Sequence, residues 1–219
     1  DDGNMFCKFR AFDQYSGHSW AGGYGDSDSG NNQESASEAL FSWVGMYLWG
    51  EATQNQKYID AGAYGFTTEM DAVEQYWFDY DEDNWLPEYP FQAAGQIYGA
   101  SLGYGTYFGG QPTYVYGIQW LPISEYLTNY GMNQEKCAKI YKGLEDDTAY
   151  AINIEKNILG NITSDDEYVT PDNGWQHITW PYLSQTDPKR AYDKFEKNVS
   201  KVQTEDRANT LWFISAMDE

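Results

Sequence analysis

Segments with helical periodicity, separated by long loops, constrain the fold of this 219-residue chain more than any other feature. Between Ser37 and Gly50 apolar residues recur at helical spacing, and Gly50 is expected to end that helix. Between Lys57 and Trp77 they recur at intervals of three and four residues. The two apolar faces consist of Leu40, Phe41, Val44, Tyr47 and Leu48, and of Ile59, Ala63, Phe66, Met70, Val73 and Trp77. Further helices are predicted over 124–130, 133–158, 175–185 and 188–200.

The segments between these helices are rich in glycine and in polar or aromatic residues. Residues 1–33 are predicted to form a long loop rather than a regular element, and residues 79–117 loops with short strands. A connection is expected over 160–174 and a short strand at 210–215. Helices outnumber strands, so the pattern predicts a mainly α fold. A helical toroid with substrate loops on one rim fits this pattern, as does any mostly α domain with long loops.

The composition limits the classes of partner. Hydrophobic residues make up 41% of the chain, which is enough for a packed core, and 34 acidic against 13 basic residues leave a net charge of -21. A field of that sign repels phosphate backbones and anionic headgroups, so neither nucleic acid nor a membrane is expected as a partner. A neutral polysaccharide is not repelled by a negative field. The chain opens on Asp1 without a basic, apolar leader, so we expect a processed, trimmed or fragmentary sequence.

Two cysteines, Cys7 and Cys137, lie far apart in the sequence. They are expected either to be buried free thiols or to form a single disulfide. A zinc site built from them with His18 and His177 would lack any close pair of ligands. No metal or cofactor is therefore predicted.

The most informative residues are two glutamates, Glu34 and Glu38, at a predicted junction between loop and helix. On a helix, a spacing of four places both carboxylates on one face, about 6 Å apart along the axis. One interpretation is a solvated first turn whose acidic residues favour the helix dipole. The other is catalytic, with one carboxylate taking a proton from water while its neighbour orients that water or tunes its basicity.

An aromatic and polar segment upstream favours the catalytic interpretation. Residues 12–21 combine the carboxylate of Asp13, the imidazole of His18 and the indole of Trp20 within ten positions. Sugar rings are bound in this way, with aromatic faces against C–H surfaces and planar polar groups paired with hydroxyls. A structural role for His18 remains the alternative.

These segments closely resemble the signature of glycoside hydrolase family 81. The first two motifs are Asp13-x-Tyr15-x-Gly17-His18-Ser19-Trp20-Ala21 and Gly30-Asn31-Asn32-Gln33-Glu34-Ser35-x-Ser37-Glu38-Ala39. The resemblance continues through Leu48-Trp49-Gly50, Thr67-Thr68-Glu69, Gln75-Tyr76-Trp77, Thr106-Tyr107-Phe108-Gly109-Gly110 and Gly117-Ile118-Gln119-Trp120-Leu121-Pro122-Ile123. It covers essentially the whole chain and is weakest after about residue 135.

The resemblance implies a secreted, monomeric endo-β-1,3-glucanase that inverts the anomeric centre. Its fold would be an α/α toroid of the six-hairpin type, preceded by a β-sandwich domain, with residues 1–219 as one partial catalytic domain. Glu34 would be the general base and Glu38 the second essential carboxylate. The substrate-binding residues would be Asp13, Tyr15, His18, Trp20, Asn32 and Gln33.

One departure concerns the general acid. The family carries it as an aspartate in an upstream motif of the form Asn-Asp-His-His-Phe-His-Tyr-Gly, which does not occur in this sequence. Inversion requires an acid and a base about 6.5–9.5 Å apart across the sugar, and Glu34 and Glu38 are too alike in position to straddle the bond. Asp13 is a weak replacement, so a fragment that lacks its first half is the simpler interpretation. Such a fragment could instead bind glucan without cutting it, or be inactive and unstable alone.

Other site classes are disfavoured by spacing. The acidic runs at 26–30 and 79–83 lack the bidentate glutamate and the glycine of a calcium-binding EF-hand loop. Neither histidine lies in a Gly-x-Ser-x-Gly context, which disfavours a serine hydrolase. The glycines between Gly99 and Gly110 lack the lysine of a phosphate-binding loop.

Overall fold

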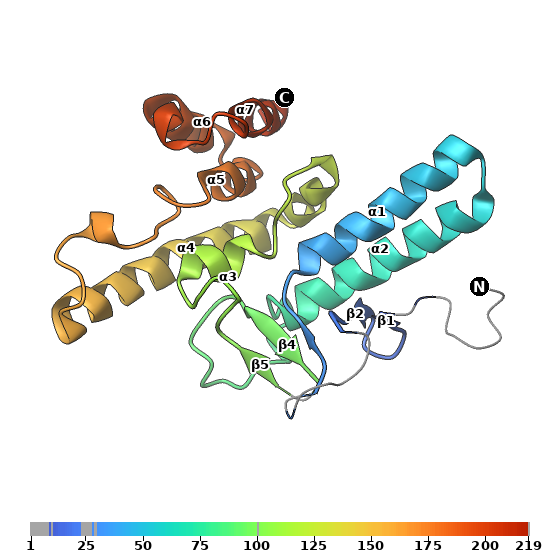
Figure 1. Cartoon of the computed structure of the whole chain (residues 1–219), viewed down its shortest axis with the longest axis horizontal. Coiled ribbons are helices and arrows are strands. Elements are labelled where there is room, and N and C mark those ends of the chain that lie inside the picture. Colours follow the sequence, from blue (N-terminus) through green and yellow to red (C-terminus); the bar gives the residue numbers. More distant parts are fainter. Residues whose placement is uncertain (1–8, 10, 23–27, 29, 100, 219) are drawn as a thin grey trace.

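A computed structural model describes residues 9, 11–22, 28, 30–99 and 101–218. Helices dominate and succeed one another in packed pairs, with the loops and short strands gathered on one side (Figure 1). This confirms the prediction of a mainly α fold of the α/α-toroid type. The helices are α1 (Ala36–Thr53), α2 (Gln56–Tyr76), α3 (Pro112–Gly117), α4 (Gln134–Asn153), α5 (Gln176–Ser184), α6 (Pro188–Asn198) and α7 (Arg207–Ala216). Short 3-10 helices cover Glu125–Met132, Asp165–Glu167 and Val199–Lys201, and a π-helical stretch, Ile154–Leu159, extends α4.

Two small antiparallel sheets lie beside the first helix pair. The strands β1 (Phe12–Asp13) and β2 (His18–Ser19) form a hairpin, and β3 (Asn32–Gln33), β4 (Gln96–Tyr98) and β5 (Leu102–Gly103) form a three-stranded sheet in that order. The prediction of a long loop over residues 1–33 is therefore wrong at the three short strands 12–13, 18–19 and 32–33. A tight turn closes the hairpin, because the Gly17 N–H donates to the Asp13 carbonyl at 2.8 Å and Gly17 adopts a φ of +77°.

Glycines set the close packing of α1 against α2. Gly50 does not end α1, which continues to Thr53. A Cβ at Gly50 would lie 2.6 Å from the Ile59 backbone nitrogen, so the residue permits close approach of the helices. Gly62 on α2 meets the Tyr47 backbone in the same way. Three of the predicted apolar positions on α1, namely Phe41, Tyr47 and Leu48, are exposed instead of buried.

The C-terminal segment is helical, so the predicted strand at 210–215 is wrong. Thr210, Phe213 and Ile214 are all buried on one side of α7. Their spacing of three and four residues matches a helix rather than the alternation of a strand. A separate short helix, α3, was missed within the stretch predicted as loops and strands.

The core joins the two halves of the chain. Trp77, Trp120 and Trp180 are fully buried, and the Trp120 ring stacks on Tyr182 with centroids 3.7 Å apart. Cys137 on α4 is also buried and is a free thiol, whereas Cys7 lies outside the described residues. Among the described helices, none is long and apolar enough to cross a membrane.

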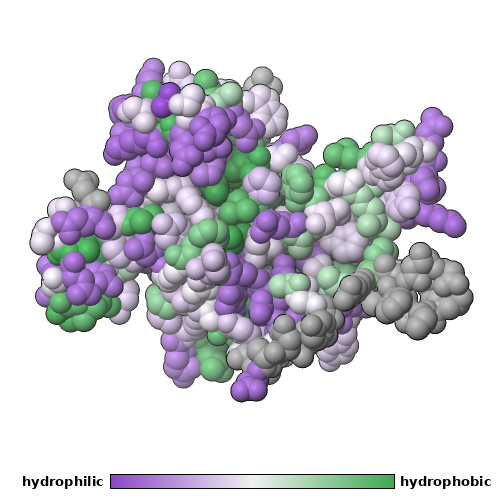
Figure 2. Space-filling view, viewed as in Figure 1, coloured by the Kyte–Doolittle hydropathy of each residue, from purple (hydrophilic) through white to green (hydrophobic). Residues whose placement is uncertain are grey.

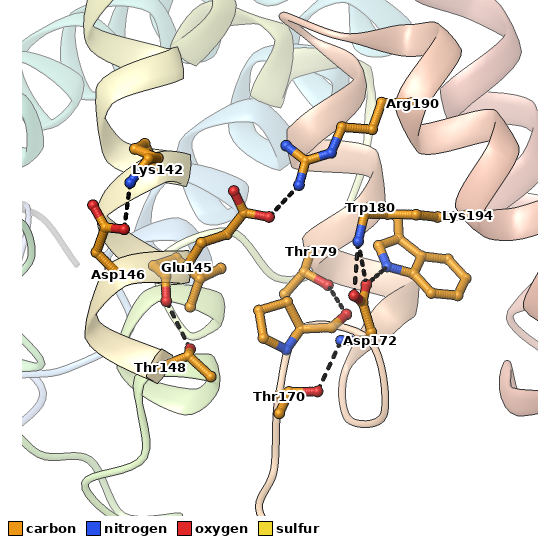
Figure 3. A network of polar contacts seen from close by, with 12 residues as sticks. Lys142, Glu145, Asp146, Thr148, Thr170, Asp172, Thr179, Trp180, Arg190 and Lys194 are labelled. Atoms are coloured by element: carbon orange, nitrogen blue, oxygen red, sulfur yellow. Dashed lines mark hydrogen bonds and ion pairs between the residues drawn. The ribbon is translucent and has the colours of Figure 1, made fainter. Parts of the chain in front are cut away.

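A polar network fixes the loop before α5 to the helices around it (Figure 3). Lys194 of α6 contacts the Asp172 carboxylate at 2.7 Å, and the Trp180 indole of α5 donates to the same carboxylate at 2.9 Å. Arg190 of α6 pairs with Glu145 of α4. These contacts tie α6 to α4, and α5 and α6 to the loop before α5. The C-terminal helices carry mostly hydrophilic side chains at the top of the view in Figure 2.

Candidate active site

A cleft of about 630 Å³ opens where β2, the end of β3 and the first half of α1 meet. Its walls include both predicted carboxylates, Glu34 and Glu38, with Gln33 beside them and the indoles of Trp20 and Trp43. The structure thus brings the acidic motif and the upstream aromatic motif to one surface. A cleft that combines carboxylates with flat aromatic rings suits a neutral sugar polymer.

The two carboxylates lie at the predicted junction between loop and helix, but they do not share the helix, so the spacing of one helix face does not apply to them. Helix α1 begins at Ala36, and Glu34 lies between β3 and the N-cap residue Ser35. Glu38 lies in the first turn of α1 and is exposed. The β3 pairing keeps the chain extended up to Gln33, and this places Glu34 on the sheet side of the cleft and Glu38 on its helix side.

The start of α1 is held by a distant segment. The Ala36 N–H donates to the Gln119 side-chain oxygen at 3.1 Å, and the Gln119 amide donates to the Gly95 carbonyl at 3.2 Å. The Ser35 and Ser37 hydroxyls donate to backbone carbonyls of the same Gly117–Ile123 motif. Gln119 is fully buried, so it satisfies a helix N-terminus that has no side-chain cap of its own. This anchoring fixes the two glutamates relative to the core.

Two donors orient the Glu34 carboxylate. The Gln96 side-chain amide donates to Glu34 Oε2 at 2.5 Å, and the Tyr107 backbone N–H donates to the same oxygen at 2.9 Å. The register that pairs Asn32 with Tyr98, continued along the strands, places Gln96 opposite Glu34. The Tyr98 hydroxyl donates to Gln96 Oε1, which turns the amide nitrogen of Gln96 toward Glu34. Neither donor engages Oε1 of Glu34.

The upstream motif builds the aromatic wall, with His18 behind it. Trp20 lines the cleft, and its indole donates to Asp13 Oδ2 at 3.2 Å. His18 is only 1% exposed and packs its ring against Trp20, with centroids 4.4 Å apart. Burial lowers the pKa of His18, which keeps the imidazole neutral. His18 is not among the residues that line the cleft, and its ring packs behind Trp20.

The remaining predicted binding residues are dispersed around the cleft. Tyr15 is 99% exposed at the tip of the β1–β2 hairpin. The backbone N–H of Tyr15, assisted by the Trp20 indole, lowers the pKa of Asp13, which therefore remains an anion. Asn32 is half-buried on β3, and the buried Gln33 donates to the Ser35 carbonyl at 3.0 Å.

A buried carboxylate of α2, Glu69, connects the two walls; it belongs to the Thr67-Thr68-Glu69 motif, to which no role was assigned from the sequence. It accepts the Ser19 N–H at 2.7 Å, the Ser19 hydroxyl at 2.9 Å and the Trp43 indole N–H at 2.5 Å. Ser19 and Trp43 both line the cleft, whereas Glu69 is 1% exposed. Burial raises the pKa of Glu69. Its role is to position the two walls.

Sequence reasoning missed Gln96 and Tyr98 and gave Glu69 no role in the site, although it noted the motif that contains Glu69. Gln96 lies 62 residues from Glu34, and only the strand pairing brings them together. A glutamate at a buried helix position was a usable signal for Glu69, because unpaired acidic residues are rarely buried. Within the described part of the chain, no group of three or more side chains is arranged to hold a metal ion.

Comparisons with known proteins identify the family of the chain. The family model described as the glycosyl hydrolase family 81 C-terminal domain matches residues 1–214. The chain belongs to glycosyl hydrolase family 81. A solved glycoside hydrolase family 81 structure from Clostridium thermocellum, in a mutant form, superimposes with a TM-score of 0.82 at 31% identity, over 99% of this chain and 28% of that one.

Curated relatives give the same assignment. A glucan endo-1,3-beta-D-glucosidase from Acetivibrio thermocellus is 34% identical over 97% of this chain, and one from Thermobifida fusca is 28% identical over 100% of it. The chain spans 25% and 26% of the length of these relatives.

Proposed function

We propose that this chain is the part of an endo-β-1,3-glucanase that supplies the general base, and that Glu34 is that base. The observation that carries the proposal is the anchored Glu34 carboxylate at the wall of an open cleft, with two donors on one oxygen and neither on the other. An oriented carboxylate with an oxygen that neither donor occupies can take a proton from an attacking water. The named activities of the relatives support the substrate class, a β-1,3-glucan.

In the proposed reaction, water attacks the anomeric carbon from the face opposite the leaving oxygen. Glu34 accepts the proton of that water, while Glu38, exposed on the helix side of the same cleft, helps to hold the water or the adjacent sugar. Trp20 supplies an apolar face for a sugar ring. The bond to the leaving oxygen breaks as an acid protonates that oxygen, and the anomeric centre inverts.

The proton donor is proposed to lie outside these 219 residues. Asp13 is a poor candidate, because its hydrogen bonds lower its pKa and favour the charged form. Glu69 has a raised pKa but is engaged by Ser19 and Trp43 and is sealed from the cleft. We therefore propose that the acid comes from a preceding segment of the complete enzyme. The polymeric substrate also leads us to propose a secreted protein.

The arrangement of Gln96 and Tyr98 makes them positioning residues in this proposal. Tyr98 fixes the rotamer of the Gln96 amide, and Gln96 fixes the Glu34 carboxylate. Preorganised hydrogen bonds of this kind hold a base in its reactive geometry before substrate arrives.

The stereochemistry of the products tests this proposal. Proton NMR of laminarin hydrolysed by the full-length protein that contains this chain is expected to show the α-anomer first, with β-anomer appearing only through mutarotation. An initial β-anomer would rule out an inverting base at Glu34. No hydrolysis of laminarin by the full-length protein would rule out the proposed activity itself.

A further inference from the structure

A tight turn between β5 and α3 presents two aromatic side chains to solvent. Thr106 and Gly109 close the turn through reciprocal backbone hydrogen bonds of 3.1 Å, and the Thr106 hydroxyl donates to the Gly109 carbonyl at 2.9 Å. The two central residues, Tyr107 and Phe108, are 89% and 53% exposed. Two adjacent aromatic groups exposed at a closed turn form a contiguous apolar surface, which is the kind of surface that binding sites use.

This turn is joined directly to the proposed base. The Tyr107 N–H donates to Glu34 Oε2 at 2.9 Å, yet the Tyr107 ring remains in solvent. A ligand seated on that ring therefore lies within one residue's reach of the Glu34 carboxylate. The backbone of Tyr107 and its side chain thus have separable roles.

The turn is also backed by a fixed aromatic cluster. The Phe108 ring meets Trp175 edge-on at 5.1 Å, and Tyr114 of α3 meets the same indole at 5.0 Å. Trp175 in turn is seated against Gly117, where a Cβ would lie 2.7 Å from the indole ring. Because Trp175 cannot move toward α3, Phe108 is held from behind and its outer side stays exposed.

We propose that Tyr107 and Phe108 form a sugar-binding platform for a β-1,3-glucan chain, one or more residues away from the bond that is cut. This inference rests on the proposed function and extends it to two residues that do not line the cleft itself. The rings offer flat apolar faces to the C–H surfaces of glucose units, and the Tyr107 hydroxyl can pair with a sugar hydroxyl. A neutral chain is also the polymer that a protein of net charge -21 does not repel.

The test measures binding without turnover. Laminaribiose and laminarihexaose are titrated by calorimetry into full-length protein carrying Glu34→Gln, and then into the same protein with Tyr107→Ala or Phe108→Ala added. Each added substitution is expected to weaken laminarihexaose binding about three- to tenfold, the range of an aromatic contact, and to leave laminaribiose binding at the cleft nearly unchanged. Tyr107→Ala keeps the N–H that contacts Glu34, so any loss reports on the ring.

Two controls keep the result interpretable. Tyr150→Ala removes a comparably exposed tyrosine from α4 and should change neither affinity. Ring resonances of labelled tyrosine, with that of Tyr107 identified by its loss in Tyr107→Phe, should shift on adding laminarihexaose in the Glu34→Gln protein. If that protein binds laminarihexaose while both alanine variants bind within twofold of it and the Tyr107 resonance does not move, the platform is refuted. If neither oligosaccharide binds the Glu34→Gln protein or the wild type, the proposed function fails with it.

Discussion

Replacing Glu69 with leucine should loosen both walls of the cleft and destabilise the fold around it. The carboxylate accepts three hydrogen bonds, two from Ser19 and one from Trp43, at 2.5–2.9 Å. A hydrogen bond to a charged group contributes about 1.5–3 kcal/mol. Water can replace part of what the half-buried Ser19 loses, but the buried Trp43 indole N–H would be left without an acceptor.

Removing a buried charge offsets part of that loss. We therefore expect Glu69→Leu to lower the free energy of unfolding by about 2–4 kcal/mol, which urea denaturation of the full-length protein at pH 7 would measure. The matched control is Leu40→Ala on α1, a fully buried residue whose truncation should cost a similar amount without removing a polar partner from Ser19 or Trp43. At denaturant concentrations where both variants remain folded, only Glu69→Leu should weaken oligosaccharide binding. A loss below about 0.5 kcal/mol would refute the anchoring role.

The contribution of Glu69 to stability should change with pH in one direction. Burial raises the pKa of Glu69 above its ordinary value of 4.5. The part of the stability that comes from this raised pKa is therefore fully present below that value and is lost as the pH rises through the folded-state pKa. In Glu69→Gln this dependence disappears, so the stability advantage of the wild type over the variant should shrink from pH 4 to pH 7. An advantage that grows over this range would contradict the assignment.

Three further predictions address the frame of the site and the chain as a whole. Gln96→Leu should lower turnover on laminarin at least tenfold with KM little changed, because Gln96 orients Glu34. Tyr98→Phe should give a smaller loss of the same kind, since Tyr98 acts through Gln96. Equal effects on kcat and KM would point to a structural role. Gly62→Ala should destabilise the α1–α2 pair by about 1–3 kcal/mol in thermal or urea unfolding, since its Cβ would meet the Tyr47 nitrogen at 2.6 Å; an unchanged midpoint would show that the helices can separate. The isolated 219-residue chain should release no reducing sugar from laminarin, once near-UV circular dichroism has confirmed that it is folded. Hydrolysis at ordinary enzyme rates would mean that a carboxylate within the chain is the acid, and Asp13 would be the first residue to mutate.

Local periodicity was sufficient to locate most of the helices. The spacing of apolar residues between Lys57 and Trp77 predicted α2 almost to its ends, because the buried positions Met70, Val73 and Trp77 follow a helical period. Periodicity failed where close packing or tertiary burial determined the structure. Gly50 suggested a helix end but serves close packing against Ile59, a contact that periodicity does not report. The β-branched and aromatic residues near the C-terminus suggested a strand, yet tertiary burial of Phe213 and Ile214 selects a helix.

The chemistry of the site was only partly accessible from sequence. The motifs around His18 and Glu34 predicted that these segments share a site, because their combined aromatic and acidic residues are typical of sugar binding and match the family signature. The helix start was predicted to within one residue, at Ser37 against the observed Ala36. The strand pairing of Asn32 and Gln33, which keeps Glu34 off α1, was not predicted. Contacts between distant segments, such as that of Gln96 with Glu34, leave no pattern in the local sequence. They can be identified only once the fold is known.

The most direct measurement is the turnover of Glu34→Gln on laminarin in the full-length protein, beside its affinity for laminarihexaose. The amide keeps the size of the side chain and cannot accept a proton, so kcat should fall by a hundredfold or more while the affinity stays nearly the same. Exogenous azide, a small nucleophile that needs no base, should restore turnover and give an α-glycosyl azide product. A variant that keeps a tenth or more of wild-type turnover would contradict the assignment of Glu34 as the general base.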